Sequence, residues 1–201
     1  YAKAYLEKHP EALQRVKDSA RRVVKLKLQV GLYDNPVPGA ENIGLVGNSE
    51  DVNHALEAAR DSIVLLKNKD NVLPLSTSTA SVFLTGHSAD NVGYQCGGWS
   101  ISWTGDSGNA LFPHGVSIKQ GMEKIVGNNS FTYFNGLNVT GNYTDADLAT
   151  AVKMASAAEY TIAAIGEDTY AEKSGDINDL DLPIGQVEYV KALAATGTKV
   201  I

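Results

Sequence analysis

From residue 80 to the end, the sequence alternates short apolar runs with helix-like segments, and this order constrains the fold most. Continuous apolar runs predict strands buried on both faces, and strands that alternate with helices form mostly parallel sheets. The sequence therefore predicts an α/β fold, a mostly parallel sheet sandwiched by helices. The expected strands are 80–85, 131–134, 160–165 and 199–201, and the expected helices are 115–126, 144–157 (with Thr144 as N-cap) and 184–195.

The N-terminal part of the chain predicts helices rather than a sheet. Apolar residues recur at helical spacing over 1–28, and a turn-rich linker follows. The apolar stripe of this helix must cover something that lies later in the chain or outside it. We expect a second helix over 51–62, with Asp51 or Ser49 as its N-cap, and a short buried strand over 63–66.

Composition excludes several classes of function. The chain has 201 residues, 43% of them hydrophobic, and a net charge of −6. The acidic balance disfavours a nucleic-acid partner, and no apolar run approaches the ~20 residues that cross a membrane. The single cysteine, Cys96, excludes an internal disulfide and a cysteine metal cluster, and the four histidines are scattered. We therefore expect no metal, no cofactor and no membrane partner.

The loop after the first expected strand has unusual content. Residues 86–106 hold both tryptophans, Trp99 and Trp103, the only cysteine and the pair Gly97-Gly98. The two tryptophans share one face of the chain whether it is extended or helical. A tryptophan ring matches the apolar C–H face of a sugar, but tryptophan is also highly buried on average. Composition therefore leaves sugar contact and core packing open.

A second unusual loop, 166–183, follows the strand expected at 160–165 and is crowded with carboxylates, Glu172 and Asp176 among them. In parallel sheets ligands bind outside the carboxyl ends of the strands, so we expect this loop and 86–108 to open on one edge. Like charge can raise the pKa of a carboxyl group and suit it to general acid catalysis. One alternative is a calcium site, although the spacing of these carboxylates is not that of an EF-hand. The other is an acidic loop that is simply exposed to solvent.

Three Asn-x-Ser/Thr triplets predict glycosylation at Asn128, Asn138 and Asn142. Because they cluster in a polar region, they indicate a secretory route. We expect a secreted protein or one of a vacuolar or lysosome-like compartment.

Four blocks together carry a family pattern. They are 21–36 (RRVVKLKLQVGLYDNP), 58–74 (AARDSIVLLKNKDNVLP), 86–108 (GHSADNVGYQCGGWSISWTGDSG) and 164–183 (AIGEDTYAEKSGDINDLDLP). These blocks resemble glycoside hydrolase family 3, in the branch of β-glucosidases and plant-type β-glucan exohydrolases. The resemblance covers nearly the whole chain, and the third block is its most specific part.

The resemblance implies a domain order of N-terminal (β/α)8-type barrel, linker and α/β sandwich. Residues 1–36 are then the C-terminal helical end of the barrel domain, 37–50 the linker, and 51–201 a sandwich domain that is incomplete at its C-terminus. Because the chain starts inside a helix and stops inside an apolar strand, we expect it to be part of a longer protein.

The resemblance also implies a retaining, exo-acting β-glucosidase that removes terminal non-reducing glucose from β-glucosides or β-glucan oligosaccharides. An aspartate of the barrel acts as nucleophile, and Glu172, in the motif Tyr170-Ala171-Glu172, is the acid/base. Trp103 corresponds to the tryptophan that stacks on the outgoing sugar. Trp99 is a further candidate for the same wall, with packing as its expected role, and Asp176 supports the sugar slot.

The chain departs from the family pattern in two places. Residues 109–115 (NALFPHG) do not resemble the Thr-rich turn that usually follows the third block, and the nucleophile segment is absent. We therefore expect these 201 residues alone to be inactive, with the missing N-terminal barrel of the parent chain as partner. The alternative is a non-catalytic carbohydrate-binding or scaffold module. A nucleotide-binding domain is disfavoured because no G-x-G-x-x-G motif occurs.

Overall fold

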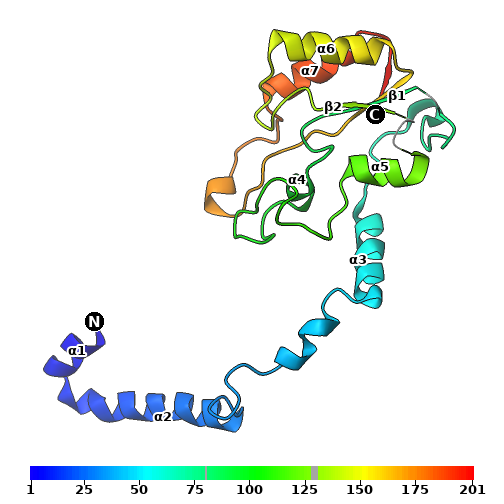
Figure 1. Cartoon of the computed structure of the whole chain (residues 1–201). Coiled ribbons are helices and arrows are strands. Elements are labelled where there is room, and N and C mark those ends of the chain that lie inside the picture. Colours follow the sequence, from blue (N-terminus) through cyan, green and yellow to red (C-terminus); the bar gives the residue numbers. More distant parts are fainter. Residues whose placement is uncertain (80, 128–130) are drawn as a thin grey trace. The chain divides into compact units, whose positions relative to one another are not determined.

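The computed structural model describes residues 1–79, 81–127 and 131–201. These residues form two compact units, Tyr1–Lys69 and Asp70–Ile201 (Figure 1). The first, called the N-terminal unit, contains helices and turns. The second, called the sheet unit, contains the four strands of the described residues and the helices that cover them.

The long helix predicted over 1–28 is broken in two, which corrects the prediction. Helix α1 spans Ala2–Lys8 and helix α2 spans Leu13–Gln29, with a 3-10 turn at Pro10–Ala12 between them. His9 lies directly before the proline and has φ −134° and ψ 66°. The residue before a proline is driven out of the helical region, so the break occurs at this position.

Helix α3 spans Ser49–Ser62 and is capped by Asn48, not by the expected Asp51 or Ser49. The Asn48 side-chain oxygen accepts hydrogen bonds from the backbone N–H groups of Glu50 and Asp51, at 2.9 and 3.1 Å. Asparagine is among the strongest N-caps because its side-chain oxygen reaches these donors.

The strand expected over 63–66 does not form. These four apolar residues follow α3 without regular structure, and their exposed fractions run from 62% to 92%. Apolar, β-branched composition favours a strand, but a strand exists only where a neighbour supplies its hydrogen bonds.

The sheet unit contains an all-parallel sheet, which confirms the α/β prediction. The strands are β1 (Val82–Thr85), β2 (Thr132–Phe134), β3 (Tyr160–Ala163) and β4 (Lys199–Val200), in the order β2-β1-β3-β4. Strand β1 lies between β2 and β3, with Leu84 opposite Tyr133 and Thr85 opposite Ala163. The sheet therefore has β1 and β3 at its centre, and both loops of interest leave from these two strands.

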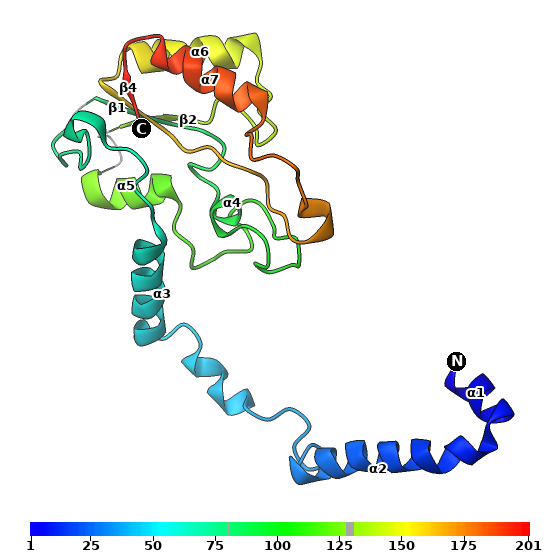
Figure 2. The same cartoon turned by 180° about the vertical axis from the view of Figure 1, so that it is seen from behind.

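Helices cover both faces of this sheet. Helices α6 (Asp145–Ser156) and α7 (Ile184–Ala194) lie on one face, and α5 (Ile118–Val126) lies on the other (Figures 1 and 2). The short α4 spans Val92–Cys96, and further 3-10 turns occur at Ala40–Leu45, Lys69–Asn71 and Lys173–Gly175. In the described ranges, no helix is long and apolar enough to cross a membrane.

Two helices of the sheet unit begin with reciprocal capping boxes. Thr144 caps α6, as predicted, and Asp147 returns a bond to the Thr144 backbone N–H at 3.1 Å. Ser117 caps α5 in the same way with Gln120. The α5 helix therefore starts three residues later than the sequence predicts, because its cap is Ser117.

The core of the sheet unit lies between β1 and the pair α6 and α7. Phe83, Tyr189 and Leu193 are fully buried there, together with two small alanines of α6. The Tyr189 hydroxyl shares a 2.7 Å hydrogen bond with Thr85 Oγ1, so the last residue of β1 is bonded to α7. Gly136 sits against this hydroxyl at φ +82°, where any side chain would collide with it.

We predict that Leu193→Ala destabilises the protein by about 2–5 kcal/mol, because the truncated side chain leaves a cavity in a closely packed core. The matched control is Ile125→Ala on α5, where the side chain is 72% exposed. This control should change stability by no more than about 0.5 kcal/mol. Urea unfolding of both variants measures the difference, and equal losses would contradict the assigned core.

Candidate functional site

The two unusual loops begin side by side at the carboxyl edge of the sheet, as predicted. The segment that follows β3 stays bonded to β1 beyond the last strand pair. The Ala164 N–H donates to the Thr85 carbonyl at 2.9 Å, and the Ser88 N–H donates to the Ala164 carbonyl at 3.1 Å. We call residues 86–108 the aromatic loop and residues 166–183 the acidic loop.

The aromatic loop is closed at its base by hydrogen bonds. The Asn91 side-chain oxygen accepts from the backbone N–H groups of Tyr94 and Gly108, at 3.0 and 2.8 Å. The Gly93 N–H donates to the Gly108 carbonyl at 3.0 Å, and Asn109 accepts from the Val92 N–H at 2.8 Å. These bonds hold the two ends of the loop together.

Glycines allow the two loops to touch through their backbones. A side chain at Gly98 would collide with the carbonyl oxygen of Tyr170, which lies two residues before Glu172. A side chain at Gly105 would collide with the Gly97 carbonyl oxygen and would lie 2.9 Å from the Thr169 Cβ atom. Glycine is therefore required at both positions for this close approach.

The two tryptophans sit on a tight turn, which is neither of the conformations considered from the sequence. The Trp99 N–H donates to the Trp103 carbonyl at 3.0 Å, and Trp99 and Ile101 have φ values of 60° and 67°. The turn brings the rings edge to face with centroids 6.5 Å apart. Trp99 is 68% exposed and Trp103 44% exposed, so both rings face solvent.

Glu172 lies next to this aromatic turn. Its neighbour Lys173 places its ammonium 5.8 Å from the centre of the Trp103 ring, a cation–π contact between the acidic and aromatic loops. Glu172 is exposed, and in the part of the chain that the structure describes no hydrogen bond or ion pair involves its carboxylate.

Asp176 is placed at the far end of the same short turn. It is exposed, and its backbone N–H donates to the Lys173 carbonyl at 3.0 Å. The 3-10 turn Lys173–Gly175 thus separates Asp176 from Glu172. Among the described residues, no group of three or more His, Cys, Asp or Glu side chains is arranged to hold a metal ion.

A buried histidine that sequence reasoning missed lies at the start of the aromatic loop. His87 is two residues beyond the end of β1 and is 5% exposed. Its Nδ1 atom is hydrogen-bonded to the Ser88 hydroxyl at 3.0 Å, and the Tyr94 ring meets its ring edge to face at 5.2 Å. Its Nε2 atom is buried and has no hydrogen-bond partner among the described residues.

The surroundings of His87 favour its neutral form. Burial lowers the pKa of His87, and the nearby Gln186 side chain, Gly166 backbone and Asp168 carboxylate oppose this shift only in part. Burial and the Asp168 charge also raise the pKa of Tyr94. Burial therefore disfavours both the protonated form of His87 and the ionised form of Tyr94.

Two further residues with buried polar atoms were not found from the sequence. Gln186 on α7 is fully buried, and Asp106 in the aromatic loop has a buried Oδ2 atom without a hydrogen-bond partner among the described residues. Asp106 and His87 both lie in a block that carries the family resemblance, but no spacing singles them out. Gln186 lies in a helix whose pattern gives no local signal of a polar role.

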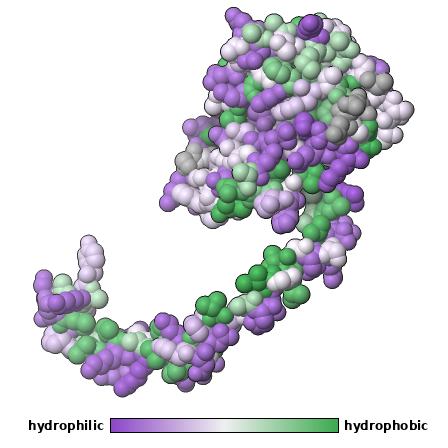
Figure 3. All heavy atoms as spheres, in the orientation of Figure 1, coloured by the Kyte–Doolittle hydropathy of each residue, from purple (hydrophilic) through white to green (hydrophobic). Residues whose placement is uncertain are grey.

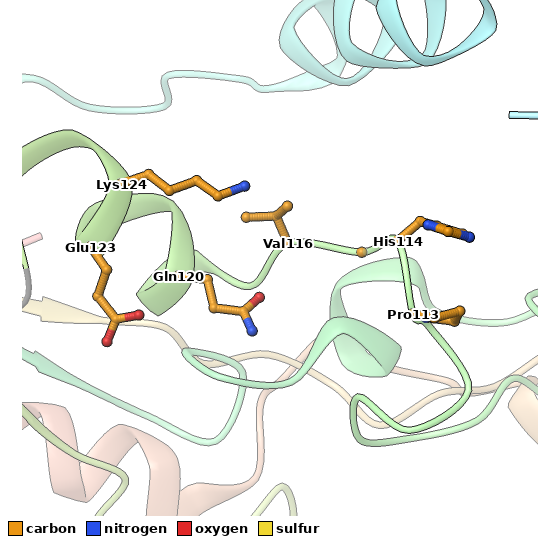
Figure 4. A pocket seen from close by; sticks show the side chains of 7 residues that line it. Pro113, His114, Val116, Gln120, Glu123 and Lys124 are labelled. Carbon is orange, nitrogen blue, oxygen red and sulfur yellow. The ribbon is translucent and has the colours of Figure 1, made fainter. Parts of the chain in front are cut away.

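A cleft of about 520 Å³ lies apart from the candidate residues (Figure 4). It is formed by the end of the segment 109–115 and by α5, and the Lys124 side chain extends toward Val116 across it. None of Glu172, Trp103, Trp99 and Asp176 lines it. The lining residues are Pro113, His114, Gly115, Val116, Gln120, Glu123 and Lys124.

Two of the three candidate glycosylation residues lie in one exposed turn between β2 and α6. The Asn138 side-chain oxygen accepts from Thr140 Oγ1 and from the Asn142 N–H, both at 2.8 Å. The Asn142 side-chain amide donates to Thr140 Oγ1 at 2.8 Å. Asn128 lies outside the described residues.

A family model for the glycosyl hydrolase family 3 C-terminal domain matches residues 63–201. The chain belongs to this family. The match includes both loops of the candidate site and the whole sheet, so the fold and the site lie in the matched part.

Relatives and solved structures agree with this family 3 domain. The chain is 37% identical over 191 residues to a lysosomal β-glucosidase of Dictyostelium discoideum, covering 91% of this chain and 23% of that protein. It is 26% identical to a periplasmic β-glucosidase of Salmonella typhimurium, covering 92% of this chain and 26% of that protein. It is 29% identical to a β-xylosidase of Formosa agariphila, covering 96% and 27%.

A crystal structure of a β-glucosidase from Listeria innocua in complex with isofagomine superimposes with a TM-score of 0.78 at 20% identity, over 98% of this chain and 26% of that one. This likeness shows the fold. The chain spans about a quarter of the length of the curated relatives it matches.

We predict that His87 makes this family 3 domain less stable at acidic pH. Because the pKa of folded His87 lies below its unfolded value of about 6.5, the unfolded chain takes up a proton first as the pH falls. Stability is therefore lost as the pH drops below about 6.5 and is unaffected by His87 above it. Thermal unfolding midpoints between acidic and neutral pH should fall less for His87→Asn than for the parent protein.

His114→Asn is the matched control for this experiment, because His114 is exposed. It should keep the pH dependence of the parent protein. If the pH curves of His87→Asn and the parent protein run parallel, the assignment of a neutral, buried His87 is wrong.

Proposed function

We propose that this family 3 domain is part of a retaining, exo-acting β-glucosidase, in which it supplies the acid/base carboxylate and an aromatic wall of the sugar slot. The observation that carries the proposal is the contact between the two loops. Lys173, next to Glu172, lies over the Trp103 ring at 5.8 Å. This contact brings the acidic loop, which carries Glu172, against the exposed ring of Trp103.

In this proposal Glu172 is the acid/base residue. Its exposed carboxyl group can donate a proton to the glycosidic oxygen as the C–O bond to the leaving group breaks. The resulting carboxylate can then accept a proton from the water that attacks the glycosyl-enzyme. The nucleophile of this cycle is an aspartate of the N-terminal barrel of the parent chain, so these 201 residues by themselves are inactive.

The exposed apolar surface of the N-terminal unit favours a partner domain in the parent chain. Helix α2 buries none of its residues, and Figure 3 shows hydrophobic side chains along the surface of this unit. Val23, Val24 and Leu28 are 45–60% exposed on α2. Large exposed apolar surface usually marks an interface, and the barrel is the proposed occupant. In this proposal residues 1–36 end the barrel domain, 37–50 form the linker and 51–201 begin the sandwich domain.

The proposed substrate is a β-glucoside or a β-glucan oligosaccharide. The named relatives include β-glucosidases and β-xylosidases, so a β-linked sugar is common to them, and glucose is the narrower proposal. The lysosomal and periplasmic relatives suit a location outside the cytosol. We further propose a secreted glycoprotein, with Asn138 and Asn142 exposed for glycosylation.

Glu172→Gln in the full-length protein should lose hydrolysis most severely on poor leaving groups, because they depend most on protonation. We expect a loss of at least about 100-fold with phenyl β-glucoside and a much smaller loss with dinitrophenyl β-glucoside. Glu188→Gln, an exposed carboxylate on α7, is the control and should keep parental activity on both. Similar losses on the two substrates would count against the acid/base role and favour a non-catalytic module.

Trp103→Ala should weaken binding of longer substrates more than that of short ones, because the lost ring face stacks on the outgoing sugar. We expect the KM for a β-glucan oligosaccharide to rise by roughly tenfold, which corresponds to a loss of about 1.4 kcal/mol of binding free energy. The KM for a nitrophenyl glucoside should change less. Leu111→Ala, also exposed and outside the site, is the control, and an unchanged substrate preference in Trp103→Ala would refute the stacking role.

A further inference from the structure

Gln186 is a fully buried polar residue to which neither the fold nor the proposed chemistry assigns a role. It lies in the first turn of α7 and has an exposed fraction of 0%. A buried amide is costly unless its donors and acceptor are bonded, because folding removes them from water. The bonds that Gln186 makes therefore indicate what it holds in place.

The Gln186 side chain binds both backbone groups of one residue of the acidic loop. Its Oε1 atom accepts from the Gly166 N–H at 3.2 Å, and its Nε2 atom donates to the Gly166 carbonyl at 2.8 Å. A neighbouring strand would make the same two bonds. The side chain thus continues the pairing of this segment after β3 has ended at Ala163. Nε2 also donates to the Val139 carbonyl.

Gly166 is held six residues before Glu172. Ala164 is still bonded to β1, and Tyr170 is packed against the Gly98 backbone. Between these two points Gln186 provides the bonds from α7 to the backbone of the acidic loop. The position of the Glu172 carboxylate therefore depends on the core helix α7 as well as on the aromatic loop.

A buried pair of threonines in the same sheet provides a comparison for Gln186. Thr161 Oγ1 and Thr198 Oγ1 share a 2.9 Å hydrogen bond, and Thr161 lies near the start of β3 rather than at its end. This pair joins β3 to the segment before β4, away from both loops. Substitution of Gln186 removes buried hydrogen bonds beyond the end of β3, whereas substitution of Thr161 removes one near its start.

We propose that Gln186 is a positioning residue for Glu172, which it serves by holding Gly166 so that the acidic loop presents the carboxylate at the aromatic turn. This inference rests on the proposed acid/base role of Glu172. Gln186 itself does not contact the substrate.

The test uses the full-length protein and two substrates, phenyl and dinitrophenyl β-glucoside. Gln186→Met keeps the shape of the side chain but cannot bond Gly166. A displacement of about 1 Å can cost roughly 100-fold in rate, so kcat with the phenyl substrate should fall at least about tenfold more than with the dinitrophenyl substrate. Amide hydrogen exchange over residues 167–172 should also become faster.

Thr161→Val is the matched control, since it also breaks a buried hydrogen bond of β3. It should lower the unfolding midpoint without changing the ratio of the two kcat values or the exchange over 167–172. An unchanged ratio in folded Gln186→Met, or an equal change in Thr161→Val, would overturn the proposal.

Gln186→Asn provides a second variant, because it keeps the amide but is too short to bond Gly166 in the same way. It should show a smaller change of the same kind, and loss of folding in both variants would assign Gln186 to stability alone and end the proposal. Glu172→Gln measured alongside separates the two hypotheses. If it shows no dependence on the leaving group, the proposed function fails, whereas a dependence there without one at Gln186 rejects only the positioning role.

Discussion

The parallel pairing of β1 with β3 is the constraint on which the site depends. Because Thr85 lies opposite Ala163, the aromatic and acidic loops leave the sheet one strand spacing apart, about 4.8 Å. Every contact between the aromatic and acidic loops follows from this start. Two segments about eighty residues apart in sequence thus form one surface, and their relative position is set by backbone hydrogen bonds in the middle of the sheet.

Two features hold the loops in place: glycines where their backbones touch, and buried hydrogen bonds from helix α7. Gly98 and Gly105 let backbone approach backbone, which fixes the loops without filling the space around the tryptophans. On the other side, Gln186 and Tyr189 extend from α7 to the ends of β3 and β1. The same helix therefore closes the core and supports the edge of the sheet where the candidate residues lie.

The candidate residues differ from the residues that support them. Glu172, Trp99 and Trp103 are exposed, whereas His87 and Gln186 are buried. Exposed aromatic faces and an exposed carboxylate add little to stability, and in the proposed function they contact the sugar. The buried amide of Gln186 adds rigidity to the acidic loop, because leaving it unbonded would be costly. This division suits a site that must be both open to a ligand and precisely placed.

Local patterns in the sequence were enough for the strands β1 to β4, the Thr144 cap and the parallel class of the sheet, because strand periodicity and capping act over a few residues. The family blocks singled out Glu172 and Trp103 as candidate residues. The tertiary structure decided the rest. It left 63–66 without a partner strand, folded the tryptophans onto a turn, and buried His87 and Gln186, with Gln186 bonded to a residue twenty positions away. Such contacts depend on which segments meet in space, and no local pattern encodes that.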